Sequence, residues 1–438
     1  MVSASNVYLV DVSKDVLRYA YKGRLIGMAL AQRSAVAKEE IFTKYKELLQ
    51  NPSSGAVTYI HIPYCQYRCS FCGFAGSKVT KEEGSKYVNA LIKEIELVSQ
   101  YAYVKETPMQ AVYLGGGTPS AIEPQYLSLL IESFHKYLNL ANDCEITIEG
   151  RIHDFEGTRG KDIIQAGFNR LSIGVQSFNT KIRKSLGRVS ESKKVLEILA
   201  NLASYNRAAI IIDLIYGLPA QSVEMFLEDL KIAELAGVDG LDTYQLNVFE
   251  NSPLKKSILA GSMPDAAKIS DQGEFYKSAY EYLTKNHWHQ LSLNHYGKTS
   301  RERNIYNPWV KRKAGCLGIG AGAGGSINGW SYYRMPAAQR YIENINIGIF
   351  SPDSLSTPNS HLALSNKITE QMEKGYLNTE EIFAINADFK AKLAPYLENW
   401  LQAKLVEFDG KYMNLTTAGK FWGVNLTRAV TDILTGEK

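Results

Sequence analysis

Short apolar runs that alternate with longer helix-like segments are the feature that most constrains how this chain folds. The runs are TYIHI (58–62), QAVYLG (110–115), EITIEG (145–150), RLSIGVQ (170–176), AAIIIDLIYG (208–217) and GLDTYQLNV (240–248). Strands separated by helices form βαβ units and a parallel sheet. About six such units between residues 57 and 250 predict an α/β fold, a partial (β/α)6 barrel. In such barrels the loops after the strands build the site.

The chain is too long for a barrel alone. Its 438 residues favour a barrel plus a smaller domain. From about residue 360 the pattern changes to two helices, a hairpin around Asp409-Gly410 and a further helix. We therefore expect an N-terminal helical extension (1–54), a barrel with its C-terminal extension (55–350) and a small winged-helix-like α+β domain (351–438).

Charge and hydropathy narrow the class of protein. A net charge of +4 is too weak to indicate nucleic-acid binding, and the winged-helix-like segment lacks concentrated basic charge. The N-terminus does not resemble an export signal, and no run of about 18 apolar residues occurs. We expect a soluble, cytoplasmic protein with no membrane span and no nucleic-acid partner.

Three cysteines lie within eight positions. Cys65, Cys69 and Cys72 are clustered, whereas Cys144 and Cys316 stand alone. An odd cluster cannot form disulfides within itself, and structural zinc normally takes four protein ligands. Three thiolates suit a [4Fe–4S] cluster with one iron left open, and zinc remains the alternative.

A glycine-rich turn follows the second predicted strand. Gly115, Gly116 and Gly117 are followed by Thr118 in YLGGGTPS. Glycines let the backbone approach a ligand closely, although a tight turn gives the same pattern. The stretch lacks the GxxxxGK[ST] pattern of a nucleotide P-loop.

The cysteine spacing, with Phe71 before the third cysteine, resembles the radical SAM superfamily. In that family the open iron is chelated by S-adenosylmethionine (SAM), which one electron cleaves to a 5'-deoxyadenosyl radical. The preceding YIHIP resembles the coproporphyrinogen dehydrogenase-like branch. The resemblance implies a cluster on Cys65, Cys69 and Cys72. It implies SAM contacts from Tyr59, Phe71, Gly116, Gly117, Thr118, Glu149, Gln176, Arg188 and Asp213.

Other stretches select a subgroup within this branch. Phe74 stands where coproporphyrinogen dehydrogenases carry a fourth cysteine. EGRIHDF (149–155), RERNIYN (301–307) and the terminal TTAGKFW resemble the anaerobic haem-degrading radical SAM methyltransferases, the anaerobilin synthases. This resemblance implies two SAM molecules, transfer of a methyl-derived carbon to haem, opening of the macrocycle to a linear tetrapyrrole and release of iron. A haem chaperone of the same fold is the alternative, and a coproporphyrinogen dehydrogenase is a weaker one.

The same resemblance implies partners and further residues. Haem is the expected substrate, a low-potential protein such as a flavodoxin the expected electron donor, and the C-terminal domain a lid. His153, His295 and Arg151 are the candidate catalytic residues, whereas His61 is expected to shape the cysteine loop. The candidates for haem propionates are Arg301, Arg303, Lys311, Arg312 and Lys313, with a solvated basic face as the alternative. The candidates for a wall of the haem site are Trp330, Tyr332 and Tyr333.

Overall fold

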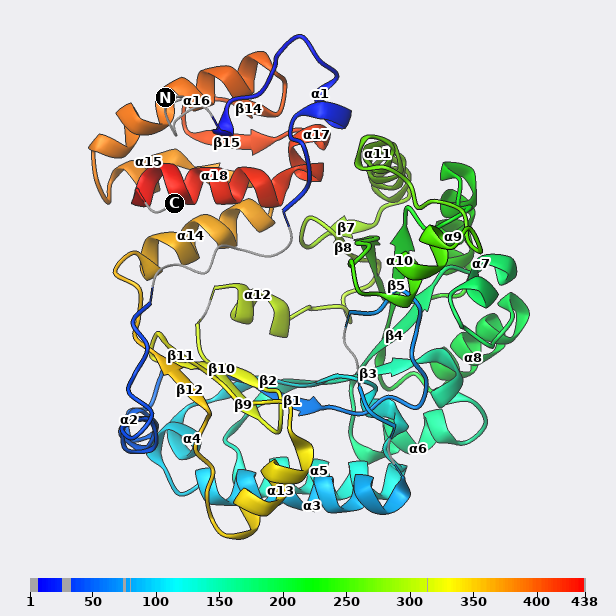
Figure 1. The fold of residues 1–438 in the computed structure, drawn as a ribbon, viewed down its shortest axis with the longest axis vertical. Coiled ribbons are helices and arrows are strands. Elements are labelled where there is room, and N and C mark those ends of the chain that lie inside the picture. Colours follow the sequence, from blue (N-terminus) through cyan, green and yellow to red (C-terminus); the bar gives the residue numbers. More distant parts are fainter. Residues whose placement is uncertain (1–6, 26–32, 74–75, 79, 313, 437–438) are drawn as a thin grey trace.

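The computed structural model describes residues 7–25, 33–73, 76–78, 80–312 and 314–436. Its centre is a curved sheet of 12 strands in the order β12-β11-β10-β9-β1-β2-β3-β4-β5-β6-β8-β7. Helices cover the outer face of this sheet, and the C-terminal helices lie beside its open side (Figure 1).

Six neighbouring strands form the parallel part of the sheet. They are β1 (Ala56–Ile62), β2 (Met109–Gly116), β3 (Leu140–Arg151), β4 (Arg170–Gln176), β5 (Ala209–Tyr216) and β6 (Gly240–Gln245). Each predicted run falls on one of them. Among the described residues, the terminal strands β12 and β7 do not pair with each other, so the sheet stays open. The predicted α/β partial barrel is confirmed.

Shorter strands extend both edges of the parallel part. β9 (Cys316–Ile319) pairs parallel with β1 and continues into antiparallel β10 (Gly324–Ile327), β11 (Trp330–Tyr333) and β12 (Ser354–Ser356). At the other edge, β8 (His295–Gly297) pairs antiparallel with β6 and with β7 (His289–Gln290).

Amphipathic helices cover the outside of the strands. The main ones are α3 (Lys81–Val98), α5 (Pro124–Tyr137), α6 (Arg159–Ala166), α8 (Ser192–Ser204), α9 (Val223–Leu235) and α11 (Ile269–Lys285). Helix α3 begins at a capping box, in which Thr80 and Glu83 satisfy each other's backbone N–H groups. Its predicted apolar stripe packs inward, with Tyr87, Leu91 and Ile95 fully buried.

A short helix lies against the inner face of the sheet. Helix α12 (Tyr306–Lys311) contacts β1, β2 and α14 (Leu362–Glu373), and it occupies the open middle of the ribbon (Figure 1). The Tyr306 ring stacks on Tyr113 with their centroids 4.3 Å apart. The segment that contains RERNIYN therefore fills part of the barrel interior.

The C-terminal residues form helices around a second sheet. Strands β13 (Tyr376–Asn378), β15 (Tyr412–Leu415) and β14 (Val406–Phe408) pair in that order. Strands β14 and β15 form the predicted hairpin, with Gly410 at a φ of 98°. The helices are α14, α15 (Thr379–Phe383), α16 (Asp388–Gln402), α17 (Thr417–Phe421) and α18 (Gly423–Thr435).

The first described residues pack against the last helices of the chain. We call residues 7–25, which contain α1 (Val16–Tyr19), the N-terminal strap. The Trp400 indole donates to the Tyr8 carbonyl at 3.0 Å, and the Trp422 indole donates to the Val16 carbonyl at 2.8 Å. The predicted N-terminal helix is α2 (Ile41–Leu49), which contacts β12. In the described part of the chain, no helix has the length and apolarity needed to span a membrane.

Candidate active site

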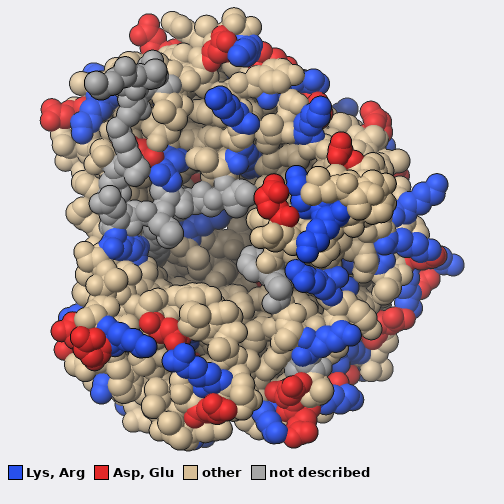
Figure 2. Space-filling view, in the orientation of Figure 1, with Lys and Arg blue, Asp and Glu red and all other residues tan. Residues whose placement is uncertain are grey.

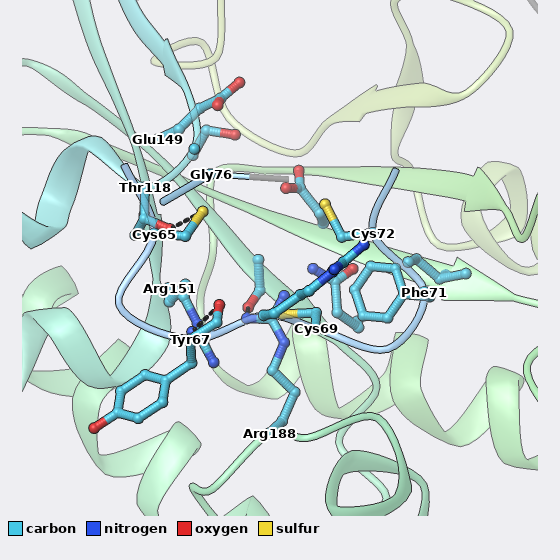
Figure 3. A pocket seen from close by; sticks show the side chains of 18 of the residues that line it. Cys65, Tyr67, Cys69, Phe71, Cys72, Gly76, Thr118, Glu149, Arg151 and Arg188 are labelled. Atoms are coloured by element: carbon cyan, nitrogen blue, oxygen red, sulfur yellow. Dashed lines mark hydrogen bonds between the residues drawn. The ribbon is translucent and has the colours of Figure 1, made fainter. Parts of the chain in front are cut away.

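The loop between β1 and α3 places the three clustered cysteines around one pocket. Cys65 and Cys72 are partly exposed and Cys69 is buried, and all three line this pocket (Figure 3). Among the described residues, no three His, Cys, Asp or Glu side chains come close enough together to hold a single metal ion. The thiols are spread around the pocket, as a multi-iron cluster requires.

The glycine-rich turn packs directly on the start of this loop. The Gly117 amide donates to the Ile62 carbonyl and the Thr118 amide to the Tyr64 carbonyl, both at 2.7 Å. A Cβ on Gly117 would lie 2.2 Å from the Tyr64 carbonyl oxygen. Only glycine permits this approach, so the turn positions the cysteine loop and also lines the pocket.

Two buried guanidinium groups face the pocket without an acidic partner. Arg151 and Arg188 are only 6% and 7% exposed, and the Nε atom of each has no hydrogen-bond partner among the described residues. Arg188 donates to the Gly174 carbonyl at 3.3 Å and lies over the Phe71 ring. Burial and the nearby Arg151 lower the pKa of Arg188. Such groups require a bound anion.

Two half-buried carboxyl groups lie in the same pocket. Glu149 accepts from the Tyr113 hydroxyl at 2.8 Å and from the Gly116 amide at 3.2 Å. Burial, followed by the neighbouring carboxylates Asp242 and Glu149, raises the pKa of Asp213 to about 7. A ligand with a positive charge and hydroxyl groups would complement this side of the pocket.

Gln176, at the end of β4, has an unusual backbone conformation. Its φ is 70°, in the left-handed region, although it is not a glycine. The side chain folds back so that a Cβ on Gly174 would lie 2.6 Å from its amide nitrogen. Strain of this kind is characteristic of ligand sites.

Most of the sequence-predicted SAM contacts come together at this pocket. Seven of the nine residues line it, namely Phe71, Gly117, Thr118, Glu149, Gln176, Arg188 and Asp213. Tyr59 and Gly116 are not among the lining residues. Tyr59 points into the barrel, where its hydroxyl lies 2.9 Å from His61 Nδ1, and a Cβ on Gly116 would meet the His61 ring at 2.7 Å. Histidine 61 therefore packs beneath the glycine-rich turn.

The structure places His295 in a network below the pocket, and not in the pocket itself. Its Nδ1 lies 2.9 Å from Asp242 and its Nε2 lies 2.9 Å from Glu302, which also pairs with Arg170. Burial alone would lower the pKa of His295, but the two carboxylates raise it to about 9. Each ring nitrogen of His295 thus lies beside a carboxylate, and a catalytic role for this residue stays a prediction.

His153 and Arg151 both contact the cysteine loop through Tyr67. Arg151 donates to the Tyr67 carbonyl at 3.1 Å, and the His153 ring meets the Tyr67 ring edge-on. His153 Nε2 lies 3.0 Å from Asp154, which accepts from the Ser120 hydroxyl at 2.6 Å. These contacts hold the loop segment between the first two cysteines.

The arginines predicted to bind haem propionates are engaged elsewhere. Arg301 pairs with Asn206, and Arg303 pairs with Asp143 at 2.9 Å. Asp143 and Asn206 precede or begin strands, so both arginines lie at the end of the sheet opposite the cysteine loop. Lys311 and Arg312 form ion pairs with Glu373 and Glu370 of α14. Lys313 and Phe74 lie outside the described residues.

The aromatic residues predicted to wall the haem site belong to the β10–β12 edge. The Tyr332 hydroxyl accepts from the Gly318 amide at 2.7 Å, and its ring packs edge-on against Tyr45 of α2. Trp330 contributes to a separate surface pocket beside α2, and Tyr333 is 42% exposed. This wall does not border the cysteine pocket, because three strands separate β11 from β2.

Several lining residues were not predicted from the sequence. Tyr67, Tyr113, Ser172 and Tyr244 all border the pocket. Tyr113 lies four residues before Gly117, and Tyr244 is two residues after Asp242. Strand alternation puts Tyr113, Ser172 and Tyr244 on the inner face, so period-2 counting from Glu149 or Asp213 along neighbouring strands would have found these three. Tyr67 lies in the cysteine loop, where no such period applies.

The chemical groups of the pocket match those of SAM. The guanidinium groups of Arg151 and Arg188, whose Nε atoms have no hydrogen-bond partner among the described residues, suit its carboxylate. Half-buried Asp213 and Glu149 suit its ammonium, sulfonium and ribose hydroxyls, and three thiols suit a cluster with an open iron. Arg188, Glu149 and Asp213 would hold SAM beside a cluster on Cys65, Cys69 and Cys72.

The fold and the pocket together define a class of protein, the α/β barrels whose first strand leads into a cluster-binding loop. Residues 59–233 match the model of the Radical SAM superfamily. The chain is 36% identical over 420 residues to anaerobilin synthase of Escherichia coli O157:H7, covering 94% of this chain and 93% of the relative. It is 32% identical over 277 residues to heme chaperone HemW of E. coli strain K12, covering 61% of this chain and 69% of the relative.

A solved structure extends the likeness of the fold to nearly the whole chain. The coproporphyrinogen III oxidase HemN of E. coli superposes with a TM-score of 0.77 at 20% identity, covering 96% of this chain and 98% of that one. The chain belongs to the radical SAM superfamily, in the group that includes anaerobilin synthase. Members of this superfamily use a [4Fe–4S] cluster and SAM.

Proposed function

We propose that this protein degrades haem without oxygen, by radical SAM-dependent methylation and ring opening of haem to a linear tetrapyrrole with release of iron. The observation that carries this proposal is the likeness to anaerobilin synthase, which extends over 94% of the chain and therefore well beyond the barrel. The likeness to HemW covers 61%. The cluster and SAM, when bound, supply radical chemistry and a methyl-derived carbon from a second SAM molecule.

The residues of this chain hold and orient the reactants. Arg188, in the segment between β4 and α8, and Asp213 of β5 bind opposite charges of SAM, while Gln176 and Glu149 fix its position between them. Arg151, which is also unpartnered at Nε, takes part through the Tyr67 segment of the loop. Figure 2 shows a hollow between the C-terminal helices and the barrel, and we assign the flat haem substrate to this hollow.

We also propose that residues 351–438 act as a lid over the barrel opening and that the chain divides into residues 1–54, 55–350 and 351–438. Lys420 of α17 donates to the Tyr280 hydroxyl of α11 at 2.8 Å, which holds the C-terminal helices beside the barrel. Arg24 of the N-terminal strap reaches Gln245 at the end of β6 at 2.8 Å. Both contacts support this proposal.

An anaerobic assay tests the proposed function. Reconstituted protein is mixed with haem, SAM and a low-potential reductant, and porphyrin absorption and product mass are followed. We expect the absorption to disappear only with SAM and reductant both present. With methyl-deuterated SAM, the product should gain labelled mass. Intact haem with no labelled tetrapyrrole would contradict the proposal.

A haem chaperone is the second candidate, favoured by the 32% identity to HemW. A chaperone would bind haem and deliver it unchanged to an acceptor protein. Haem binding alone shifts the porphyrin absorption band without abolishing it, so the same assay separates the two functions. A coproporphyrinogen dehydrogenase would instead leave haem untouched and release carbon dioxide from a porphyrinogen.

A further inference from the structure

The surface outside the cysteine loop is basic around an apolar centre. Basic residues gather here from three elements, namely Arg68 of the loop, Lys181 and Lys184 of α7 (Thr180–Ser185), and Lys255 and Lys256 of α10 (Pro253–Leu259). All of them are exposed except Lys255, which is half-buried. Lys and Arg side chains gather over α7 and α10 beside the hollow (Figure 2). We call these five residues, with the apolar residues between them, the loop-side patch.

The three elements form one continuous surface. The Leu254 amide of α10 donates to the Ser70 carbonyl at 2.9 Å, and a Cβ on Gly187 would lie 3.9 Å from the Arg68 carbonyl. Beneath them, Phe71 packs with Ile182, Leu186 and Leu254 in a small apolar core. The patch therefore rests on the same packing that holds the cysteine loop.

The centre of the patch exposes large apolar side chains. Tyr67 is 57% exposed, Val189 68% and Leu259 75%. Large apolar side chains inside a charged ring are typical of a protein-binding surface. Tyr67 and Arg68 also line the SAM pocket, whereas the lysines of α7 and α10 are not among its lining residues, so these two helices offer a surface beside the loop for electron entry.

The charge of the patch is strongly unbalanced. Two acidic residues lie within it, Glu191 paired with Lys184 at 2.7 Å and Glu250 paired with Lys255 at 3.6 Å. No ion pair is described for Arg68, Lys181 or Lys256 within the described residues. Five basic groups against two acidic ones produce a positive field directly over the cluster-binding loop.

We propose that the loop-side patch is the docking site of an acidic, low-potential electron-transfer protein that reduces the cluster. The proposal rests on the proposed function, since it assumes a redox-active cluster on the three cysteines. One electron passes from the reduced flavin or iron–sulfur donor to the cluster, which goes from the 2+ to the 1+ state, and no bond forms or breaks. Charge complementarity selects an acidic partner and accelerates its encounter.

The test measures cluster reduction and needs no haem. Full-length reconstituted protein is mixed anaerobically with reduced flavodoxin, and the cluster absorption is followed by stopped flow. The double variants K181E/K184E and K255E/K256E are compared with the control K390E/K392E, whose lysines lie exposed on α16. At low ionic strength we expect each patch variant to lower the second-order rate constant tenfold or more, with a weaker salt dependence.

Reduction by dithionite, a small molecule, separates docking from damage to the cluster. We expect wild-type rates with dithionite in every variant, because no protein docks in that reaction. Unchanged reduction of the patch variants by flavodoxin would overturn the proposal. An equal decrease in the rate of reduction by dithionite would also overturn the proposal, because it would mean that the patch residues stabilise the cysteine loop.

Sedimentation of the same variants tests another occupant. Loss of self-association without any change in the flavodoxin rate would assign the patch to a contact between copies of this chain and overturn the proposal. Since haem is absent throughout, a failure of haem degradation leaves these results unaffected. The two proposals therefore fail separately.

Discussion

Arg188 and Asp213 line the same pocket and complement a ligand that carries both a negative and a positive charge. Arg188 is buried and Asp213 is half-buried, and each bears a cost of desolvation that a bound complementary group would offset. The apo site is therefore built at the expense of stability, as is common where binding groups are preorganised. The consequences can be measured residue by residue.

Replacing Arg188 by lysine tests the contact with the SAM carboxylate. A lysine ammonium cannot reproduce the planar, two-donor contact of a guanidinium. We expect the R188K variant to lose about 1.5 to 3 kcal/mol of SAM binding free energy, measured by calorimetry on reconstituted protein. The exposed R207K variant serves as the control, and unchanged affinity in R188K would show that the carboxylate binds elsewhere.

Replacing Asp213 by asparagine tests the buried acid. The pKa is about 7 in the folded protein and about 3.9 in an unfolded chain. Between about pH 3.9 and about pH 7 the folded protein binds more protons than the unfolded chain does. The free energy of unfolding therefore falls as the pH rises through this range. At pH 8 the D213N variant should be more stable than wild type by about 1 to 4 kcal/mol, and near pH 4 the two should match.

Urea unfolding across this pH range measures the difference. D213N should also bind SAM more weakly at pH 8, since an amide does not complement the positive charge of the ligand. A difference in stability that did not change with pH would mean that Asp213 is already ionised in the folded state.

Replacing either isolated cysteine tests the three-ligand cluster. Cys144 and Cys316 are both buried near the ends of strands opposite the cysteine loop. We expect C144S and C316S to retain about four irons per chain after reconstitution, as a single [4Fe–4S] cluster requires. Iron and sulfide analysis measures this, with C69S as the variant expected to lose the cluster. Loss of iron in C144S or C316S would refute the model.

At this scale the motifs predicted seven of the residues that gather at the pocket, because most of the predicted SAM contacts lie near or just after the carboxyl end of a parallel strand, and these ends face the same side. Their contact with SAM stays a prediction. Roles that depend on a partner could not be predicted. His295 appeared available as a ligand, but Asp242 and Glu302 surround it. Glu302 sits between two arginines in RERNIYN, and only the fold shows that it turns inward while Arg301 and Arg303 turn out.

At the scale of elements, the segment from residue 298 to α12 connects several strands of the barrel through side-chain contacts. Glu302 is fully buried, accepts from Arg170 at 2.9 and 3.1 Å, and contacts His295. Glu145 accepts from the Ile305 amide at 3.2 Å. Glu145 lies on β3, Arg170 on β4 and His295 on β8, so the segment connects three strands of the sheet. It connects them in a sheet whose two edge strands do not pair with each other among the described residues.

Removing the charge of Glu302 should therefore destabilise the barrel. Loss of one member of a buried ion pair leaves the other charge uncompensated. We expect E302Q to lower the free energy of unfolding by about 3 to 5 kcal/mol in urea at pH 7. The control K194A removes the exposed pair with Glu156 and should cost less than about 1 kcal/mol. A loss of similar size in both variants would contradict the role given to Glu302.

The sequence predicted the elements of the parallel sheet but not how its edges end. Period-2 runs with helices between them identify strands and their order, since βαβ connections are short and right-handed. The additions β7 to β12 are two to four residues long, too short for a periodic signal. Residues 295–334 therefore looked like a binding segment, although much of the stretch forms strands at both edges and the interior helix α12.

At the scale of the whole molecule, the N-terminal strap joins the two ends of the chain. Asn399 of α16 accepts from the Val10 amide at 2.8 Å and donates to the Val10 carbonyl at 3.0 Å. The Tyr8 hydroxyl donates to Asp432 of α18 at 2.5 Å. The strap continues to Arg24, which contacts the barrel, so it connects the C-terminal helices to the barrel opening.

Replacing Asn399 by alanine should loosen the strap without unfolding the protein. Two hydrogen bonds to Val10 are lost, and local opening becomes easier by about 1 to 3 kcal/mol. We expect faster hydrogen exchange at strap amides and faster tryptic cleavage after Lys14 in N399A. The variant Q402A, on the exposed side of the same helix, should exchange as wild type does. Equal rates in N399A would show that the strap is held by its other contacts.

The strap also fixes the order of events when the ribosome makes this protein. Its residues leave the ribosome before the helices that receive them, and Tyr8 and Asp432 are 424 positions apart. Until α16 and α18 have been made, the strap has no docking surface, so its apolar residues remain open to chaperones and proteases. A polypeptide interrupted before α18 lacks part of that surface. Attachment of the strap thus requires that α18 has been made, and a quality-control protease would distinguish chains with and without α18 by cleavage within residues 7–25.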